Sequence, residues 1–131
     1  MKYATLIVGI LVGLLFVAAS VTFLFNLVTP PPPPEGSAMA AFFTAFAPTG
    51  YLTFVKVLEL LGGVLIAIPV TRRAGLLILG PIMINILAFH VFVTGGQGLL
   101  DPPLLVLTAL MLFLTWAERG AFAAFLRPTQ P

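Results

Sequence analysis

Four long apolar segments fill most of the 131 residues of this chain, and short polar turns separate them. Charged residues make up only 8% of the sequence, against about 25% in soluble globular domains. Such a small number of polar side chains cannot cover the apolar surface of four long helices. This surface is therefore expected to face lipid. The pattern predicts an all-α, polytopic membrane protein, with a four-transmembrane-helix bundle as a single domain over residues 1–131.

The first apolar segment, residues 3–28, is longer than the apolar region of a signal sequence and is expected to be a retained transmembrane helix. Five prolines at residues 30–34 then stop the helix and favour an extended polyproline II strut. The outer loop, residues 29–49, also holds a short apolar helix at residues 38–46, with Ser37 as its N-cap. This helix is too short to span, so it is expected to lie in the membrane interface.

The remaining spans are expected at residues 52–68, 74–93 and 103–118, followed by a C-terminal interfacial segment at residues 119–131. Thr71 and Asp101 are expected to cap the third and fourth transmembrane helices. Pro81 is expected to kink the third, because it removes a helical hydrogen bond.

The basic residues orient the bundle. Glu35 and Asp101 lie in two loops that contain no basic residue. The helix ends on the opposite side carry five of the six basic residues: Lys2, Arg72, Arg73, Arg119 and Arg127. Because positive charge is enriched on the cytoplasmic side, both termini are expected in the cytoplasm and the protein in the inner (cytoplasmic) membrane.

Composition excludes several kinds of function. The chain has no cysteine, which rules out disulfides, thiolate metal sites and iron–sulfur clusters formed by its own residues. One histidine and four carboxylates predict no metal site. The basic residues form no patch along the sequence, so nucleic acid is not an expected partner.

The candidate functional residues are Lys56 and Glu59 in the second span, and Asn85 and His90 in the third. Counted from the outer helix ends, Lys56 and His90 lie roughly 8 Å deep, and Glu59 and Asn85 roughly 14 Å. Ionisable groups at such depth usually face the bundle interior and mark functional sites. Lys56 and Glu59, three residues apart, share a helix face and can form an ion pair. Asn85 and His90 are about 140° apart on a helix and are not expected to face one partner squarely.

Two interpretations of this polar layer remain open. In the first, Lys56, Glu59, Asn85 and His90 form a ligand-binding pocket for a quinone headgroup or a bound lipid. Glu59 and His90 are then the candidate catalytic residues, because histidine exchanges protons near neutral pH. In the second, which we favour from the sequence, the Lys–Glu pair only joins two helices and His90 reaches the interface.

Small and aromatic residues offer further packing surfaces. Gly9 and Gly13 form a GxxxG pair, and Gly63 and Ala67 a similar pair, which suit close helix contacts inside the bundle or with another protein. The short outer helix carries three phenylalanines, for which interfacial anchoring is favoured over a lid on the pocket: Phe42, Phe43 and Phe46.

The stretch Lys56-Val57-Leu58-Glu59-Leu60-Leu61-Gly62-Gly63, followed by Thr71-Arg72-Arg73 and a helix with His90, resembles the DoxX family of small four-helix membrane proteins. The first helix departs from the family pattern, with Thr22 or Phe23 at the position of its lysine. The resemblance implies a divergent DoxX-like branch. Family roles include a subunit of a thiosulfate:quinone oxidoreductase, partners in redox-stress complexes and membrane chaperones.

The leading functional interpretation is a small, non-catalytic accessory subunit of a larger bioenergetic or redox complex, with other integral membrane proteins and the lipid bilayer as partners. It depends on the absence of a soluble domain, the absence of a convincing redox centre, and small-residue faces on the first helix. The alternative is a quinone-linked oxidoreductase subunit that uses Lys56, Glu59 and His90. A transporter is disfavoured, because one four-helix unit lacks inverted repeats.

Overall fold

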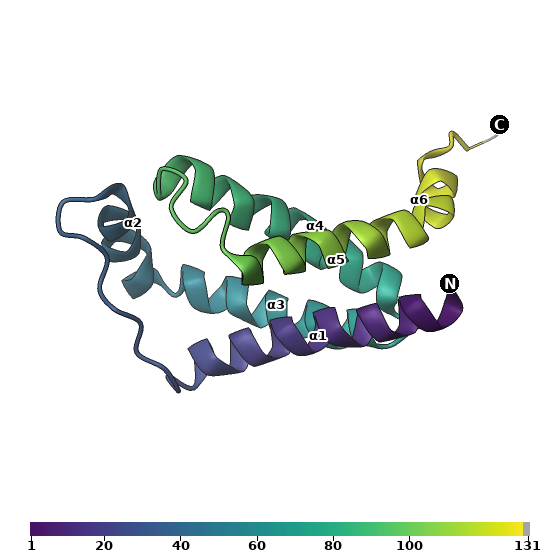
Figure 1. Ribbon diagram of the computed structural model, residues 1–131, viewed down its shortest axis with the longest axis horizontal. Helices are drawn as coiled ribbons and strands as arrows, with labels where there is room; N and C mark the ends of the chain where they lie inside the picture. Colours follow the sequence, from purple (N-terminus) through teal and green to yellow (C-terminus); the bar gives the residue numbers. More distant parts are fainter. Residues whose placement is uncertain (130–131) are drawn as a thin grey trace.

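The computed structural model describes residues 1–129 and is all-α over that range (Figure 1). Its six α-helices are α1 Lys2–Leu24, α2 Ala38–Phe46, α3 Tyr51–Ala67, α4 Arg72–Ala88, α5 Pro102–Ala117 and α6 Arg119–Leu126. A 3₁₀ turn, Ala47–Thr49, follows α2, and a π-helical segment, Phe89–Val93, continues α4. The expected all-α class is therefore confirmed.

The four longer helices, α1, α3, α4 and α5, run along the long axis of the molecule, and α2 and α6 lie at opposite ends (Figure 1). Both termini lie at the α6 end. The helix α3 packs between α1 and α4, and α5 packs against α1 and α4. Their shared core is apolar and consists of Val12, Phe16, Ile66, Leu76, Leu79, Met83, Met111 and Leu114.

Two helical segments, Lys2–Leu24 and Arg72–Val93, are long and apolar enough to cross a membrane. Two further pairs qualify only if each bent pair counts as one span: Ala38–Thr49 with Tyr51–Ala67, and Pro102–Ala117 with Arg119–Leu126. The described part of the chain thus holds two to four candidate spans. By this criterion it is a candidate multi-pass membrane protein.

The first helix ends four residues earlier than the sequence predicts, at Leu24 instead of residue 28. Asn26 adopts a left-handed conformation with φ 51°, and its N–H donates to the Phe23 carbonyl. The N–H of Leu27 donates to the Thr22 carbonyl at 3.0 Å, which completes a Schellman cap. Asn26 is therefore a helix-ending residue and not a polar residue within the span.

The two small-residue pairs pack inside the chain. A Cβ atom added at Gly13 would lie 2.6 Å from the Gly63 carbonyl oxygen and 2.7 Å from the Ala67 Cβ. At Gly9 the added atom would meet the Arg72 guanidinium at 2.6 Å. The GxxxG face of α1 is thus occupied by α3 and the start of α4, so the expectation that it is available to a partner protein is wrong.

Helix ends follow the sequence only in part. The Ser37 hydroxyl accepts the Ala40 N–H at 3.1 Å, so the expected N-cap of α2 is confirmed. Thr71 and Asp101 precede their helices without side-chain caps. The Thr71 hydroxyl donates instead to the Leu65 carbonyl at 2.8 Å. The first two helical residues after Asp101 are prolines, which have no N–H for the Asp101 side chain to accept. These two capping predictions are wrong.

The helix α4 begins at Arg72, two residues earlier than the sequence predicts, and continues through Pro81 as one element. The segment expected to follow the fourth span begins with a separate helix, α6, which is bent by 61° from α5.

Candidate ligand-binding cavity

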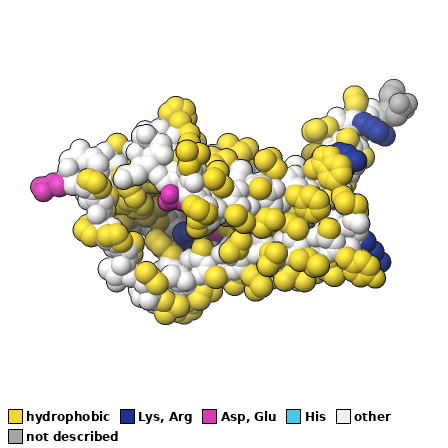
Figure 2. Space-filling model, in the orientation of Figure 1, with side chains coloured by type: hydrophobic (Ala, Val, Ile, Leu, Met, Phe, Trp, Pro, Cys, Tyr) yellow, Lys and Arg dark blue, Asp and Glu magenta, His cyan; other side chains and the backbone are white. Residues whose placement is uncertain are grey.

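A cavity of about 510 Å³ lies between α2, the first half of α3 and the end of α4. Figure 2 shows the hollow beside α2, in the half of the molecule away from the two termini. Most of its lining is apolar or aromatic, with a few polar groups: Phe42, Phe43, Tyr51, Leu52, Val55, Lys56, Glu59, Ile82, Asn85, Ile86, Ala88, Phe89, His90, Phe92 and Val93. Volumes of roughly 300–1,000 Å³ with such lining are typical of small-molecule sites.

A sharp bend at Gly50 forms one side of the cavity. The segment Ala38–Thr49 meets α3 at 83°, so α2 does not extend α3 but lies at the end of the bundle opposite the N-terminus (Figure 1). Gly50 has φ +81°, a conformation that residues with a Cβ rarely adopt. The bend brings Phe42 and Phe43 of α2 over the residues that α3 and α4 contribute.

The opposite side is formed by the π-helical segment Phe89–Val93, which the sequence analysis missed. Here Thr94 N–H donates to the Phe89 carbonyl five residues earlier, at 3.1 Å. Such turns are wider than α-helical ones and occur often at functional sites. Phe89, His90 and Val93 of this segment all line the cavity.

An ion pair between Lys56 and Glu59 lies in the wall of the cavity. The Lys56 Nζ is 3.1 Å from the Glu59 Oε2, as the i,i+3 spacing predicts. The Glu59 side chain is only 5% exposed, whereas Lys56 is 27% exposed, so the carboxylate is buried and the ammonium reaches the cavity surface. The Lys56 Nζ also lies 5.7 Å from the centre of the Phe23 ring, within the range of a cation–π contact.

His90 and Asn85 line the same cavity without touching this pair. The His90 Nδ1 lies 2.8 Å from the Ile86 carbonyl oxygen, which can only accept a hydrogen bond. The proton of a neutral ring is therefore on Nδ1, which leaves Nε2 as an acceptor. Asn85 is exposed, and among residues 1–129 its side-chain amide makes no hydrogen bond. The four predicted residues thus share one cavity, and within residues 1–129 the ion pair between Lys56 and Glu59 is the one polar interaction among them.

Aromatic rings join α2 to the π-helical segment above these polar groups. The Phe89 ring lies 5.1 Å from that of Phe42 and 5.9 Å from that of Phe43, both edge-on. Phe46 contacts Phe42 at 4.9 Å and Tyr51 at 5.3 Å. Phe42 and Phe43 therefore pack over the cavity, the arrangement that a lid requires. Sequence reasoning missed Tyr51, and it missed Phe89 although this residue is next to His90 in the sequence.

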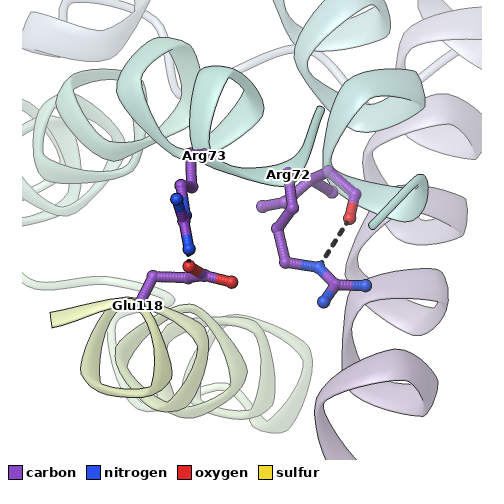
Figure 3. A network of polar contacts seen from close by, with 4 residues as sticks. Arg72, Arg73 and Glu118 are labelled. Atoms are coloured by element: carbon purple, nitrogen blue, oxygen red, sulfur yellow. Dashed lines mark hydrogen bonds and ion pairs between the residues drawn. The ribbon is translucent and has the colours of Figure 1, made fainter. Parts of the chain in front are cut away.

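A second polar cluster lies at the other end of the bundle (Figure 3). Arg73 and Glu118 point toward one another, with Nε 2.7 Å from Oε2, and join α4 to the start of α6. The neighbouring Arg72 turns toward α1 and donates from Nε to the Ile66 carbonyl at 3.2 Å. Arg72 is 4% exposed, and its Nη2 has no hydrogen-bond partner within the described part of the chain. Sequence reasoning treated Arg72 as a surface charge and missed its burial.

Comparisons of the chain with protein-family models, with curated proteins and with solved structures gave no match. Its class therefore rests on its own fold and cavity. It is an all-α candidate membrane protein with an aromatic-walled cavity that contains a lysine–glutamate ion pair.

Proposed function

We propose that this chain is a DoxX-like, four-span protein of the inner membrane that binds an amphipathic ligand of the isoprenoid quinone class in the cavity. The observation that carries the proposal is the combination, in one cavity, of aromatic rings packed edge-on with the Lys56–Glu59 pair. In this proposal both termini lie in the cytoplasm, and the cavity lies in the outer half of the bundle.

Two features support four spans in this orientation. Counting each bent helix pair as one span gives four, an even number that returns the chain to the side where it began. Five of the six basic residues then lie at the end that holds both termini, as the distribution of charge in membrane proteins favours.

The cavity provides suitable partners for each part of such a ligand. A flat ring can lie against Phe42 and Phe89, which already pack edge-on. A quinone carbonyl accepts hydrogen bonds, which the Lys56 ammonium and the Asn85 amide can donate. A quinol hydroxyl donates, and the Glu59 carboxylate or the His90 Nε2 can accept. The prenyl tail would leave through the apolar part of the lining.

The test is equilibrium binding of decyl-ubiquinone, a short-chain quinone, to the purified protein in nanodiscs. Glu59→Gln and His90→Ala should each weaken binding by about tenfold or more, because the first replaces a charged acceptor by a neutral amide and the second removes the Nε2 acceptor. The matched control is Leu77→Ala, which changes a 57% exposed residue of α4 outside the cavity lining and should bind like the parent.

Thermal unfolding of the same variants separates a binding role from a structural one. If the polar residues serve the ligand, His90→Ala loses binding while its unfolding temperature stays close to that of Leu77→Ala. Glu59→Gln also breaks the ion pair with Lys56, so its loss of binding is measured well below its own unfolding temperature. Undiminished quinone binding by both cavity variants, or no saturable binding by the parent protein, would overturn the proposal.

The second candidate is an accessory subunit of a larger membrane complex. One observation favours it: α5 fully buries only Met111 and Leu114 of its sixteen residues and leaves four large apolar side chains exposed, Leu105, Val106, Leu112 and Trp116. The measurement is the native-gel mass of the mildly solubilised protein, with mass spectrometry of everything that comigrates. Comigration with a large complex supports this candidate, whereas migration of the protein alone contradicts it.

A further inference from the structure

The end of the molecule that holds both termini has a feature that the cavity does not explain. The helix α6, Arg119–Leu126, turns by 61° from α5 and lies at the end of the bundle that holds the N-terminus (Figure 1). If α5 runs roughly along the membrane normal, a helix bent by this angle lies nearer to the membrane plane than to the normal. That is the geometry of an interfacial helix.

The side chains of α6 fit the boundary between headgroups and acyl chains. Phe122 packs against the apolar core, which holds the helix down on the bundle. Phe125 and Leu126 are 77% and 78% exposed. The protein covers neither of these two large apolar side chains, and both lie on a helix that directly follows the apolar helix α5.

The charge at this end is strongly positive. Five basic side chains and one acidic side chain lie there, and the acidic one, Glu118, is already paired with Arg73 at 2.7 Å. Among residues 1–129, no carboxylate lies within ion-pair distance of Lys2, Arg119 or Arg127. Figure 2 shows basic side chains at this end, with the visible acidic ones toward the opposite half. Arg119 and Arg127 lie at the two ends of α6.

One of these arginines is held in place by a tryptophan. The Arg119 guanidinium carbon lies 4.1 Å from the centre of the Trp116 ring, and its Nη1 donates to the Trp116 carbonyl at 2.8 Å. Trp116 is itself 51% exposed and sits on the last turn of α5. Tryptophan is enriched at membrane interfaces, so this contact fixes a positive charge at headgroup level.

We propose that this end is a binding surface for anionic phospholipids. The helix α6 lies among the headgroups with Phe125 and Leu126 toward the acyl chains, and Arg119 and Arg127 bind lipid phosphates. A lipid surface fits better than a protein partner, because apolar side chains, an interfacial tryptophan and basic residues occur together on a helix bent into the membrane plane. This surface is distinct from the ligand cavity and does not depend on what the cavity binds.

The protein carries its own probe for this proposal, because Trp116 is its only tryptophan. The protein is reconstituted in vesicles of phosphatidylcholine and phosphatidylglycerol, in which one or the other lipid carries brominated acyl chains. Bromine quenches tryptophan on contact, so the ratio of quenching at equal mole fractions gives the preference of the lipids next to Trp116. We expect phosphatidylglycerol to be preferred by about fivefold or more at low salt, and the preference to fall in high salt.

Three variants decide the role of the arginines. Arg119→Gln with Arg127→Gln should remove the preference, whereas Arg119→Lys with Arg127→Lys should keep most of it, because the charge is retained. Glu35→Gln, in the loop at the opposite end, should behave like the parent protein. Equal quenching by both lipids, or a preference that survives the double Gln change, would overturn the proposal. Quenching by brominated phosphatidylcholine reports in every variant that Trp116 is still in the membrane.

Discussion

At Gly13, α1 and α3 approach so closely that there is no room for a single methyl group. An added Cβ would lie 2.6 Å from the Gly63 carbonyl oxygen, a backbone atom that cannot move aside alone. We expect Gly13→Ala to destabilise the protein by about 1–3 kcal/mol through overpacking, and to lower the midpoint of thermal unfolding in mild detergent.

The control for this change is Gly80→Ala in α4, where an added Cβ meets nothing within 4 Å. Alanine is favoured over glycine inside a helix by up to about 1 kcal/mol, so this variant should be as stable as the parent protein or slightly more stable. Equal midpoints for Gly13→Ala and Gly80→Ala would show that the α1–α3 contact is looser than described.

Lys56 and Glu59 should behave as a unit toward stability. Lys56→Met leaves the 5% exposed Glu59 carboxylate without its partner, and we expect a loss of about 2 kcal/mol or more. Changing both residues, Lys56→Met with Glu59→Leu, removes both charges and should restore most of that loss. Thermal unfolding of the single and double variants is the measurement, and additive losses in the double variant would contradict the coupling.

At the residue scale, sequence reasoning found the polar layer but not the buried arginine. Lys56, Glu59, Asn85 and His90 stand out because polar groups are rare in apolar helices, and the structure places all four around one cavity. Arg72 is buried only because Gly9, far away in the sequence, leaves space for its guanidinium. No local pattern around Arg72 carries that information.

The short helix α2 depends on its N-cap more than the longer helices do on theirs. It has no fully buried residue and packs only through partly buried side chains, and Ser37 makes its one side-chain cap bond. Ser37→Ala should cost about 1 kcal/mol locally. Hydrogen exchange at the α2 amides should then become about fivefold faster, with α3 unchanged.

Ser37→Asp is the matched control, because aspartate caps helices about as well as serine. Exchange in α2 should stay near the parent rate in this variant. If Ser37→Ala left the exchange of α2 unchanged, the aromatic contacts with Phe89 would be the main support of this helix.

At the element scale, the sequence predicts which segments are helical better than where they end. The end of α1 at Leu24 depends on Asn26 adopting a left-handed conformation, while the apolar run continues beyond it. The π-helical turn falls in the run Phe89–Val93, whose apolar residues are equally compatible with an α-helix. That turn and the bend at Gly50 shape the cavity, and neither follows from hydropathy.

At the scale of the whole molecule, the helices differ in how well their lengths match a membrane. Hydropathy and length identify two spans directly, whereas α3 and α5 qualify only together with the bent segments next to them. At 1.5 Å per residue, the 17 residues of α3 cover about 26 Å, slightly less than a hydrocarbon core of about 30 Å.

The absence of cysteine makes the topology directly measurable, since any cysteine introduced is the only one. Suitable exposed positions are Val70 between α3 and α4, Gln97 between α4 and α5, and Thr129 after α6. With four spans and cytoplasmic termini, a membrane-impermeant maleimide should label Gln97→Cys in intact cells. Val70→Cys and Thr129→Cys should react only after permeabilisation. Labelling of both Gln97→Cys and Thr129→Cys from outside would mean that α5 does not cross. Labelling of Val70→Cys and Thr129→Cys but not Gln97→Cys would contradict the proposed topology, because an inverted orientation and an α3 that does not cross both give this pattern. Tyr3→Cys, at a 78% exposed position near the N-terminus, then distinguishes a wrong direction from a wrong number of spans, since only an inverted chain exposes it outside.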